Sequence, residues 1–338
     1  MTATETPIAF TLTPEEIRER IQARQAGDVA AAEAVAEQQY RYVRPFSTAA
    51  DGLIEFVQNP EGRFYLGLHN VDAMTRGFGR GELAYITGRA HSGKTQVVMN
   101  AINNNPDAKI LFFTPDEVSE LILAKLVALR HGLNSEFVEE RIKAKDEEVV
   151  DLVRRTASVD FRNLIVIDDS LTTSQMARAL DEARDYWGTH GDLVIIDFLE
   201  LVPGEGDVAG VTAKSQAIKR WTKQAQLPVI CLHQASRSSG DRGKAAGMGA
   251  MRYGGETEGL FVIEVFRQRE NEDLEGWERE FHQDTVTINV DKNKRPPCKT
   301  GQVDYHMDPE TGLISPMRAA SQERTNRVVE AVRQRQAS

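Results

Sequence analysis

The stretch of sequence that decides the fold reads Gly88-Arg89-Ala90-His91-Ser92-Gly93-Lys94-Thr95. It matches the pattern G-x-x-x-x-G-K-[ST], follows the apolar run Leu83–Thr87 and precedes Gln96–Ile102, a segment that can begin a helix. A strand, a glycine-rich turn and a helix N-terminus in this order form the context in which the pattern binds phosphates. The turn directs backbone N–H groups at the anion, and the helix adds unpaired donors and a partial positive charge.

We therefore expect these eight residues to hold a nucleoside triphosphate. Lys94 would reach the β- and γ-phosphates, and the hydroxyl of Thr95 would ligate Mg²⁺. The alternative is a chance match within a turn that happens to contain glycine. The strand and the helix on either side of the match favour the phosphate-binding interpretation.

The composition is typical of a globular protein rather than a membrane protein. Of the 338 residues 41% are hydrophobic, and no apolar run approaches the roughly 20 residues that span a bilayer. No secretory signal is visible at the N-terminus, and two cysteines, Cys231 and Cys298, do not indicate an oxidising compartment. We therefore expect a cytoplasmic location. The net charge of −10 argues against a surface covered by nucleic acid, but it is compatible with a local basic channel.

Short, unbroken apolar runs alternate with helical segments along the middle of the chain. The expected strands are Leu83–Thr87, Ile110–Phe113, Leu164–Ile167, Leu193–Ile196 and Val229–Leu232. The expected helices begin at Lys94 or cover Val118–Arg130, Ser174–Trp187 and Lys214–Gln226. This alternation predicts an α/β fold with a mainly parallel sheet and helices on both faces. Further strands without intervening helices are expected to extend the sheet on one side, at Leu260–Phe266, Thr285–Val290 and Gln302–Tyr305.

Composition also suggests a division of the chain into three parts. Residues 1–62 read as a helical arm and linker, with few large apolar residues and a helix start at Thr13-Pro14. This arm is either solvated or packed on a neighbouring subunit. Residues 63–316 would form the α/β domain, and residues 317–338 a basic tail.

Two apolar strands end in a carboxylate that could assist Thr95 in holding Mg²⁺. Asp197 follows the run Leu193–Ile196, and Asp168 follows Ile165–Ile167. An acid at the carboxyl edge of the sheet can bind the metal beside the phosphate loop. We favour Asp197, because the residues that follow it also fit such an element.

Three more polar residues stand where apolar strands end. Asp116 and Glu117 close the second strand, and either carboxylate could orient and polarise a water molecule for hydrolysis. The alternative is that one of them only caps the next helix. Gln234 ends the fifth strand, where its amide could contact the γ-phosphate region and report its presence to the following loop.

Two basic segments lie beyond these strands. Residues 235–255 are rich in glycine and contain one acidic residue, Asp241. The same segment contains the candidate DNA-binding residues Arg237, Arg242, Lys244 and Arg252. Such a loop suits the grip of a phosphate backbone, although an ordinary surface loop would have the same composition. The second segment contains Lys292, Lys294 and Arg295. These cations could reach the γ-phosphate of a neighbouring subunit as an arginine-finger group, or form a solvated basic turn.

Taken together, these residues resemble the RecA-like ATPase domain of the DnaB family of replicative helicases, over roughly Gly67 to Leu313. Leu68–Leu83 resembles the segment before the family's phosphate loop, and Ile110–Thr114 the strand that leads to its catalytic glutamate. Ile196–Leu201 is similar to its Walker B signature, and Pro228–Arg237 to its sensor strand. Arg252–Glu258 and the basic pair of Lys292 with Lys294 or Arg295 also have counterparts.

The resemblance implies a RecA-like P-loop fold and a ring motor, a hexamer, that hydrolyses ATP with Mg²⁺ and binds single-stranded DNA. Replication or recombination proteins would be its partners. An ungapped match puts Asp116, and not Glu117, on the position of the catalytic glutamate. From the resemblance we expect a reduced, phage-encoded member of the family that lacks the N-terminal primase-contacting domain and acts in the host cytoplasm.

Two other functions are compatible with the same residues. A RecA-type recombinase or strand-annealing ATPase would pair strands without processive unwinding. A regulatory ATPase would act as a switch that single-stranded DNA does not stimulate. The residues of the motifs around Asp116 and Asp197 favour the helicase.

Overall fold

The computed structural model describes residues 48–204, 208–235 and 258–317, together with positions 18, 19, 22 and 46. Two compact units divide the chain, at residues 1–59 and 60–338. In the first unit the described helix is α3 (Thr48–Gln58), which exposes Leu53, Ile54 and Val57. Of the helix predicted to start at Thr13-Pro14, the structure describes positions 18, 19 and 22, which are helical, and the rest lies outside the described residues.

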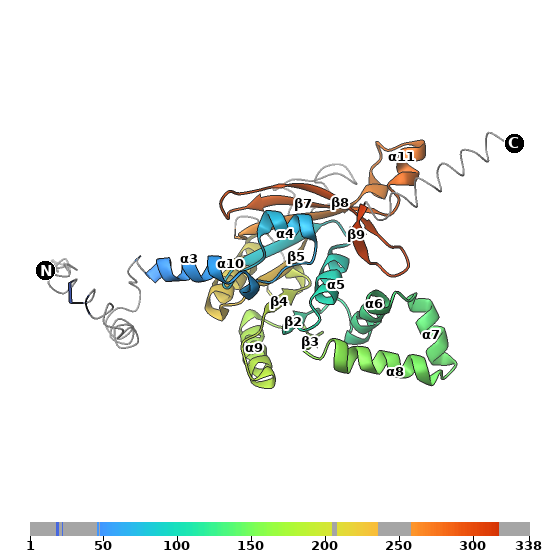
Figure 1. The fold of residues 1–338 in the computed structure, drawn as a ribbon, viewed down its shortest axis with the longest axis horizontal. Helices are drawn as coiled ribbons and strands as arrows, with labels where there is room; N and C mark the ends of the chain where they lie inside the picture. The colour runs from blue at the N-terminus through green and yellow to red at the C-terminus, as the bar shows by residue number, and fades with distance from the viewer. Residues whose placement is uncertain are drawn as a thin grey trace. The chain divides into compact units, whose positions relative to one another are not determined.

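The second unit is built on one sheet whose described strands follow the order β3-β2-β4-β5-β1-β6-β7-β8-β9 (Figure 1). Neighbours from β3 to β6 pair in parallel, and β7, β8 and β9 are antiparallel. The strands are β1 (Leu83–Gly88), β2 (Ile110–Phe113), β3 (Leu164–Ile167), β4 (Leu193–Ile196), β5 (Val229–Gln234), β6 (Phe261–Arg267), β7 (Thr285–Asn293), β8 (Gly301–Met307) and β9 (Ile314–Pro316). The predicted mainly parallel sheet with additional C-terminal strands is confirmed.

The helices of this unit are α4 (His69–Thr75), α5 (Lys94–Asn104), α6 (Ser119–His131), α7 (Ser135–Lys143), α8 (Glu147–Arg155), α9 (Thr173–Trp187), α10 (Val208–Ala225) and α11 (Gly276–Phe281). Those from α5 to α10 connect the parallel strands, whereas α4 precedes β1 and α11 lies between the antiparallel strands β6 and β7. Short turns are η1 (Pro60–Gly62), η2 (Thr156–Asp160), η3 (Leu199–Leu201) and η5 (Gln268–Glu270). None of the helices in the described part of the chain is long and apolar enough to cross a membrane.

Two local differences from the sequence expectation concern helices. The segment between α6 and β3, which had no assignment, contains α7 and α8, each capped by a side chain. Asn134 accepts a hydrogen bond from the N–H of Glu136, and Asp146 accepts from those of Glu148 and Val149. Between β6 and β7, where no helix was expected, lie η5 and the six-residue α11. An exposed, strongly polar helix of this length carries no apolar periodicity that would reveal it.

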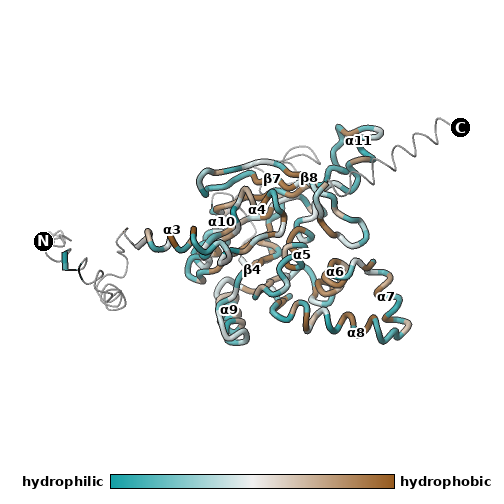
Figure 2. Tube along the Cα trace, viewed as in Figure 1, coloured by the Kyte–Doolittle hydropathy of each residue, from teal (hydrophilic) through white to brown (hydrophobic). Residues whose placement is uncertain are grey.

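Alternate residues of the strands build two cores, one on each face of the sheet. On one face Ile86, Phe112 and Ile195 pack with residues of α4, α5 and α6. On the other, Tyr85 and Phe113 pack with residues of α9 and α10. Burial on both faces explains why the strand sequences are continuously hydrophobic, as the brown segments around β4 show (Figure 2).

This architecture brings the carboxyl ends of four parallel strands to one edge of the sheet. The register pairs Gly88 of β1 with Gln234 of β5, and Phe113 of β2 with Ile196 of β4. The residues that follow these ends therefore converge, as is usual for ligand sites in open α/β sheets.

Candidate active site at the phosphate loop

The loop between β1 and α5 has the backbone of a phosphate-binding turn. His91 and Gly93 adopt left-handed conformations, with φ of 61° and 101°. A Cβ atom at Gly88 would lie 2.4 Å from the carbonyl oxygen of Val265 and from Oγ of Ser92, so only glycine fits there. The loop delivers the chain directly into the N-terminus of α5 at Lys94, where backbone N–H groups are unpaired by helix geometry.

Lys94 is buried at the base of this loop. Its Nζ donates hydrogen bonds to the carbonyl oxygens of Gly88 at 2.9 Å and Arg89 at 2.8 Å. Burial lowers the pKa of Lys94, and the nearby carboxylates of Asp197, Glu200 and Asp116 act in the opposite direction. The ammonium group is thus held beside the turn.

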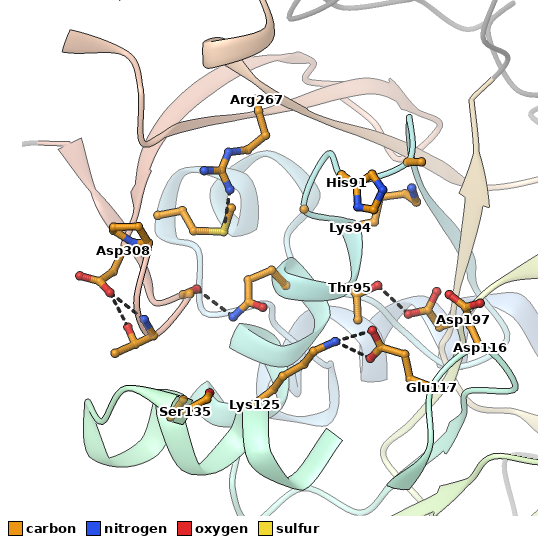
Figure 3. Close-up of a pocket in the computed structure, with 18 of the residues that line it drawn as sticks. His91, Lys94, Thr95, Asp116, Glu117, Lys125, Ser135, Asp197, Arg267 and Asp308 are labelled. Carbon is orange, nitrogen blue, oxygen red and sulfur yellow. Dashed lines mark hydrogen bonds and ion pairs between the residues drawn. The ribbon is translucent and has the colours of Figure 1, made fainter. Parts of the chain in front are cut away.

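Thr95 and Asp197 lie together, as the metal-site prediction requires. Oγ1 of Thr95 donates to Oδ2 of Asp197 at 2.8 Å (Figure 3). Burial raises the pKa of Asp197 to about 6, while Thr95 and Lys94 partly offset this effect. Asp168, the alternative from the sequence, is instead tied to the start of α6, where it accepts from the N–H and the hydroxyl of Ser119, both at 2.9 Å.

The Thr95–Asp197 pair has the donor chemistry that Mg²⁺ requires. Among the described residues there is no group of three or more His, Cys, Asp or Glu side chains that could hold a metal by themselves. A hydroxyl and one carboxylate fit a Mg²⁺ ion, which commonly uses one or two protein oxygens and completes its shell with phosphates and water.

A cavity of about 660 Å³ opens beside the loop and is large enough for a nucleotide. Both candidate catalytic acids line it, as does Gln234. Asp116 is exposed, whereas the carboxylate of Glu117 is ion-paired with Lys125 of α6 (Figure 3). The two neighbouring acids therefore differ: one is open to the cavity and the other is paired with a lysine.

The far wall of the cavity contains residues that the sequence analysis missed. Arg267, at the end of β6, is only 8% exposed; its Nη1 donates to Sδ of Met307 at 3.5 Å, and its Nε has no partner among the described residues. Burial lowers the pKa of Arg267. The available signal was Arg267 at the end of the strand-like run Phe261–Phe266, because a charged residue in that position needs a polar environment.

The turn between β8 and β9, residues 308–312, forms another part of this wall. Gln96 and Asn100 of α5 donate side-chain hydrogen bonds to the carbonyl oxygen of Gly312, both at 3.0 Å. The turn is therefore fixed to the helix that follows the phosphate loop. No local sequence pattern indicated this contact, because its partners are more than 200 residues apart.

Sequence comparison relates this phosphate loop and its surroundings to a known family. A family profile described as "DnaB-like helicase C terminal domain" matches residues 64–311. The chain belongs to this family. Membership of the DnaB-like family implies nucleotide binding, which agrees with the geometry around Lys94.

Similar curated proteins are replicative DNA helicases named DnaB. The protein of Nostoc sp. is 28% identical over 178 residues, which cover 51% of this chain and 20% of that protein. The protein of Geobacillus stearothermophilus is 23% identical over 268 residues, which cover 75% of this chain and 57% of that protein. The chain thus spans between a fifth and somewhat over half of the length of these relatives.

Two solved structures have the same fold. The first, an ATPase domain, has a TM-score of 0.69 and 16% identity, and the match covers 81% of this chain and 99% of that one. A DnaB-like replicative helicase, described with its interactions with primase, has a TM-score of 0.66 and 16% identity, covering 89% and 74%. The predicted RecA-like fold is confirmed.

The basic residues at the end of β7 lie away from this chain's own cavity. The register pairs Arg267, at the cavity, with Val286, and Phe261 with Asn293, so the end of β7 is at the opposite edge of the sheet. Arg295 is buried there. Its guanidinium donates to the carbonyl oxygens of Thr75 and Gly77, pairs with Glu82 and lies over the Phe261 ring.

Lys294 is exposed and Lys292 is half-buried, so the three basic residues have different environments. The guanidinium of Arg295 is engaged by contacts within its own chain. The candidate DNA-binding residues Arg237, Arg242, Lys244 and Arg252 lie outside the described residues. The segment that contains them leaves β5 immediately after Gln234 and Ala235, at the cavity edge.

Proposed function

We propose that this chain is the ATPase motor of a DnaB-like DNA helicase, which hydrolyses ATP and uses the energy to move along single-stranded DNA. The observation that carries the proposal is the meeting of Lys94, Thr95 and Asp197 beside a nucleotide-sized cavity with two further acids. The family assignment supports the helicase over the recombinase, strand-annealing and switch alternatives.

The phosphates of ATP would lie in the turn of residues 88–95. Lys94 would move its ammonium group from the carbonyl oxygens of Gly88 and Arg89 to the β- and γ-phosphates, a stronger, charge-assisted partner. Thr95 and Asp197 would hold Mg²⁺, which neutralises charge on the phosphates when it is bound. The 2.8 Å contact between their oxygens supports this assignment.

Asp116 is the better candidate for the base that orients the attacking water. It is exposed at the cavity, whereas the carboxylate of Glu117 is already engaged by the ammonium of Lys125. In this arrangement Glu117 fixes the side chain of Lys125 at the cavity wall. Gln234 would contact the γ-phosphate region.

The base and ribose would lie against the far wall. Arg267 presents a planar guanidinium beside the flexible thioether of Met307, and the turn 308–312 closes the side. A guanidinium plane and a thioether are both suitable surfaces for an aromatic base. Binding there would also give the buried Arg267 charge a π-face as a partner.

A neighbouring subunit would complete the site. Lys294, exposed at the opposite edge of the sheet, is better placed than Arg295 to reach a neighbour's γ-phosphate, with Lys292 beside it. We propose a ring of six subunits, with residues 1–62 as an arm, 63–316 as the motor domain and 317–338 as a basic tail. The reduced, phage-type membership stays a prediction from the sequence.

The test of this function is the variant Lys94→Ala, with Lys143→Ala as a control on the exposed surface of α7. We expect ATP hydrolysis and forked-duplex unwinding to fall by at least about 10²-fold, because a preorganised cation at the phosphates is removed. The control should keep both activities. Unchanged hydrolysis in Lys94→Ala would refute the site.

A strand-annealing assay beside the unwinding assay separates the helicase from the recombinase-type alternative. Unwinding that requires ATP supports the helicase. ATP-dependent annealing without unwinding would contradict it.

A further inference from the structure

The last residues of β5 extend beyond the end of β4. The final pair between the two strands is Ile196 with Cys231, and β4 then turns into η3 after Asp197. On its other side β5 continues to pair with β1 as far as Gln234. The N–H of Gln234 therefore needs an acceptor that β4 no longer supplies, because buried backbone donors are rarely left unpaired.

Glu200 of η3 supplies this acceptor. Its Oε1 accepts a hydrogen bond from the N–H of Gln234 at 2.9 Å. On the opposite side, the N–H of Ala235 donates to the carbonyl oxygen of Gly88 at 3.0 Å. The end of β5 is thus clamped between the Walker B turn and the first residue of the phosphate loop. We name these four residues, Glu200, Gln234, Ala235 and Gly88, the sensor clamp.

The surroundings of Glu200 keep its carboxylate in place. Lys214 of α10 donates to the backbone carbonyl of Glu200 at 3.3 Å. Nδ1 of His233, fully buried, lies 3.3 Å from Oε1 of Glu200 and 2.8 Å from the carbonyl oxygen of Gln234. Glu200 itself does not line the cavity, so its contacts hold other residues rather than the nucleotide.

Both sides of the sensor clamp lead to residues that the proposed function assigns to the nucleotide site. Asp197 precedes Glu200 by three residues, and the short helical turn η3 contains Glu200. The carbonyl of Gly88 is shared by the N–H of Ala235 and the ammonium of Lys94. When Lys94 turns to a phosphate, one of the two donors leaves this carbonyl.

We infer that Glu200 is a positioning residue that couples the nucleotide site to the basic segment 236–257, by fixing the backbone of Gln234 at the point where that segment begins. The inference rests on the proposed function and adds the route by which the γ-phosphate region acts on the DNA-binding segment. Without the sensor clamp, Gln234 can contact a phosphate, but its movement is no longer transferred along β5.

The test compares Glu200→Ala with Glu200→Gln in the full chain. The side-chain amide oxygen that the second substitution introduces can still accept from the N–H of Gln234, whereas alanine cannot. Asp192→Ala is the matched control, because Oδ2 of Asp192 accepts from the N–H of Lys109 at 2.8 Å, just before β4. This control removes the same type of hydrogen bond, from a backbone N–H to a carboxylate, before the start of β4 and not after its end.

Three quantities are measured: thermal melting, the affinity for a fluorescent ATP analogue, and the rate of ATP hydrolysis with and without single-stranded DNA. We expect Glu200→Ala to keep nucleotide affinity within about threefold and to reduce the DNA stimulation about tenfold, the size of one charge-assisted hydrogen bond. Glu200→Gln and Asp192→Ala should keep the stimulation.

Full stimulation in Glu200→Ala would overturn the inference and leave the proposed function intact. Equal losses in Glu200→Ala and Glu200→Gln would also overturn it, because the hydrogen-bond acceptor would then not be the active feature. If the unsubstituted protein hydrolyses ATP but DNA does not stimulate it, the helicase proposal fails together with the coupling.

Discussion

The burial of Asp197 lowers the stability of the fold, but it suits this carboxylate to bind a metal ion. It is only 3% exposed, with Thr95 as its hydrogen-bond partner. Desolvation dominates, so the pKa is raised from 3.8 to about 6. A buried carboxylate with a raised pKa gains stability from a cation, which fits the proposed Mg²⁺ site.

The raised pKa of Asp197 predicts how the stability of the nucleotide-free protein depends on pH. Between pH 3.8 and about 6 the folded state keeps a proton that the unfolded state has released. Stability therefore falls as pH rises through this window. Asp197→Asn does not titrate, and it should be more stable than the unsubstituted protein above pH 6, by up to ~3 kcal/mol.

Urea unfolding of both proteins at pH 4 and pH 7, in EDTA, measures this difference. The gain of Asp197→Asn should be present at pH 7 and absent at pH 4. A gain of equal size at both pH values would contradict the proposed cause.

The two neighbouring acids of the cavity offer a second residue-scale prediction. Asp116→Asn should lower kcat for ATP by about 10²–10⁴-fold, the usual contribution of a general base. Glu117→Gln should have a smaller effect on kcat, because Lys125 already engages this carboxylate. Steady-state ATPase kinetics decide between them, and a larger loss for Glu117→Gln would reverse the assignment.

At the scale of the elements, the two basic residues that follow β7 differ: Arg295 has a structural contact, and Lys294 is a candidate functional residue. Arg295 fastens the end of this strand to the chain before β1 through Thr75, Gly77 and Glu82. Lys294 is its immediate neighbour but is exposed. Two adjacent cations of similar sequence character therefore have different environments.

We expect Arg295→Ala to reduce the free energy of unfolding by about 3 kcal/mol, because Glu82, whose side chain is 20% exposed, would stay largely buried without its charged partner. Lys294→Ala should leave stability unchanged and lower the ATPase rate of the assembled protein by at least about tenfold, since phosphate-directed cations from a neighbour contribute strongly. Thermal melting and ATPase assays check both variants. A stable but inactive Arg295→Ala would return the trans-acting role to Arg295.

For DNA binding by the whole molecule, the positions of the charged residues matter more than the net charge. The chain carries a net charge of −10, yet the four basic residues proposed to grip DNA lie within one short segment. A ring would collect six copies of this segment around one channel and so create a local positive field on an acidic protein.

Replacing Arg237, Arg242, Lys244 and Arg252 by alanine should weaken binding of single-stranded DNA. The slope of log affinity against log salt concentration should shrink by roughly 0.7 for each phosphate that the protein no longer neutralises. Fluorescence anisotropy at several salt concentrations measures the slope, and a Lys143→Ala, Lys145→Ala variant serves as a control on another surface. An unchanged slope would assign DNA binding to a different part of the chain.

Much of the fold could be predicted because its signals are local. Unbroken apolar strands, the turn at Gly88 and the helix start at Lys94 each depend on a few consecutive residues. The preference for Asp197 over Asp168 also came from neighbouring residues, and the contact with Thr95 agrees with it.

The sequence by itself determined the α/β class, the phosphate loop and the residues that end its strands, because periodicity and turn chemistry act over short distances. Only the tertiary structure decided which walls enclose the cavity. Gln96 donates a hydrogen bond to Gly312, which lies 216 residues away in the sequence. Lys125 pairs with Glu117 and leaves Asp116 exposed at the cavity. Glu200 accepts the hydrogen bond from the N–H of Gln234 in β5 beyond the end of β4. The contacts of Gln96 and Glu200 follow from the packing of elements that are separated in the chain, and such packing leaves no trace in a local pattern.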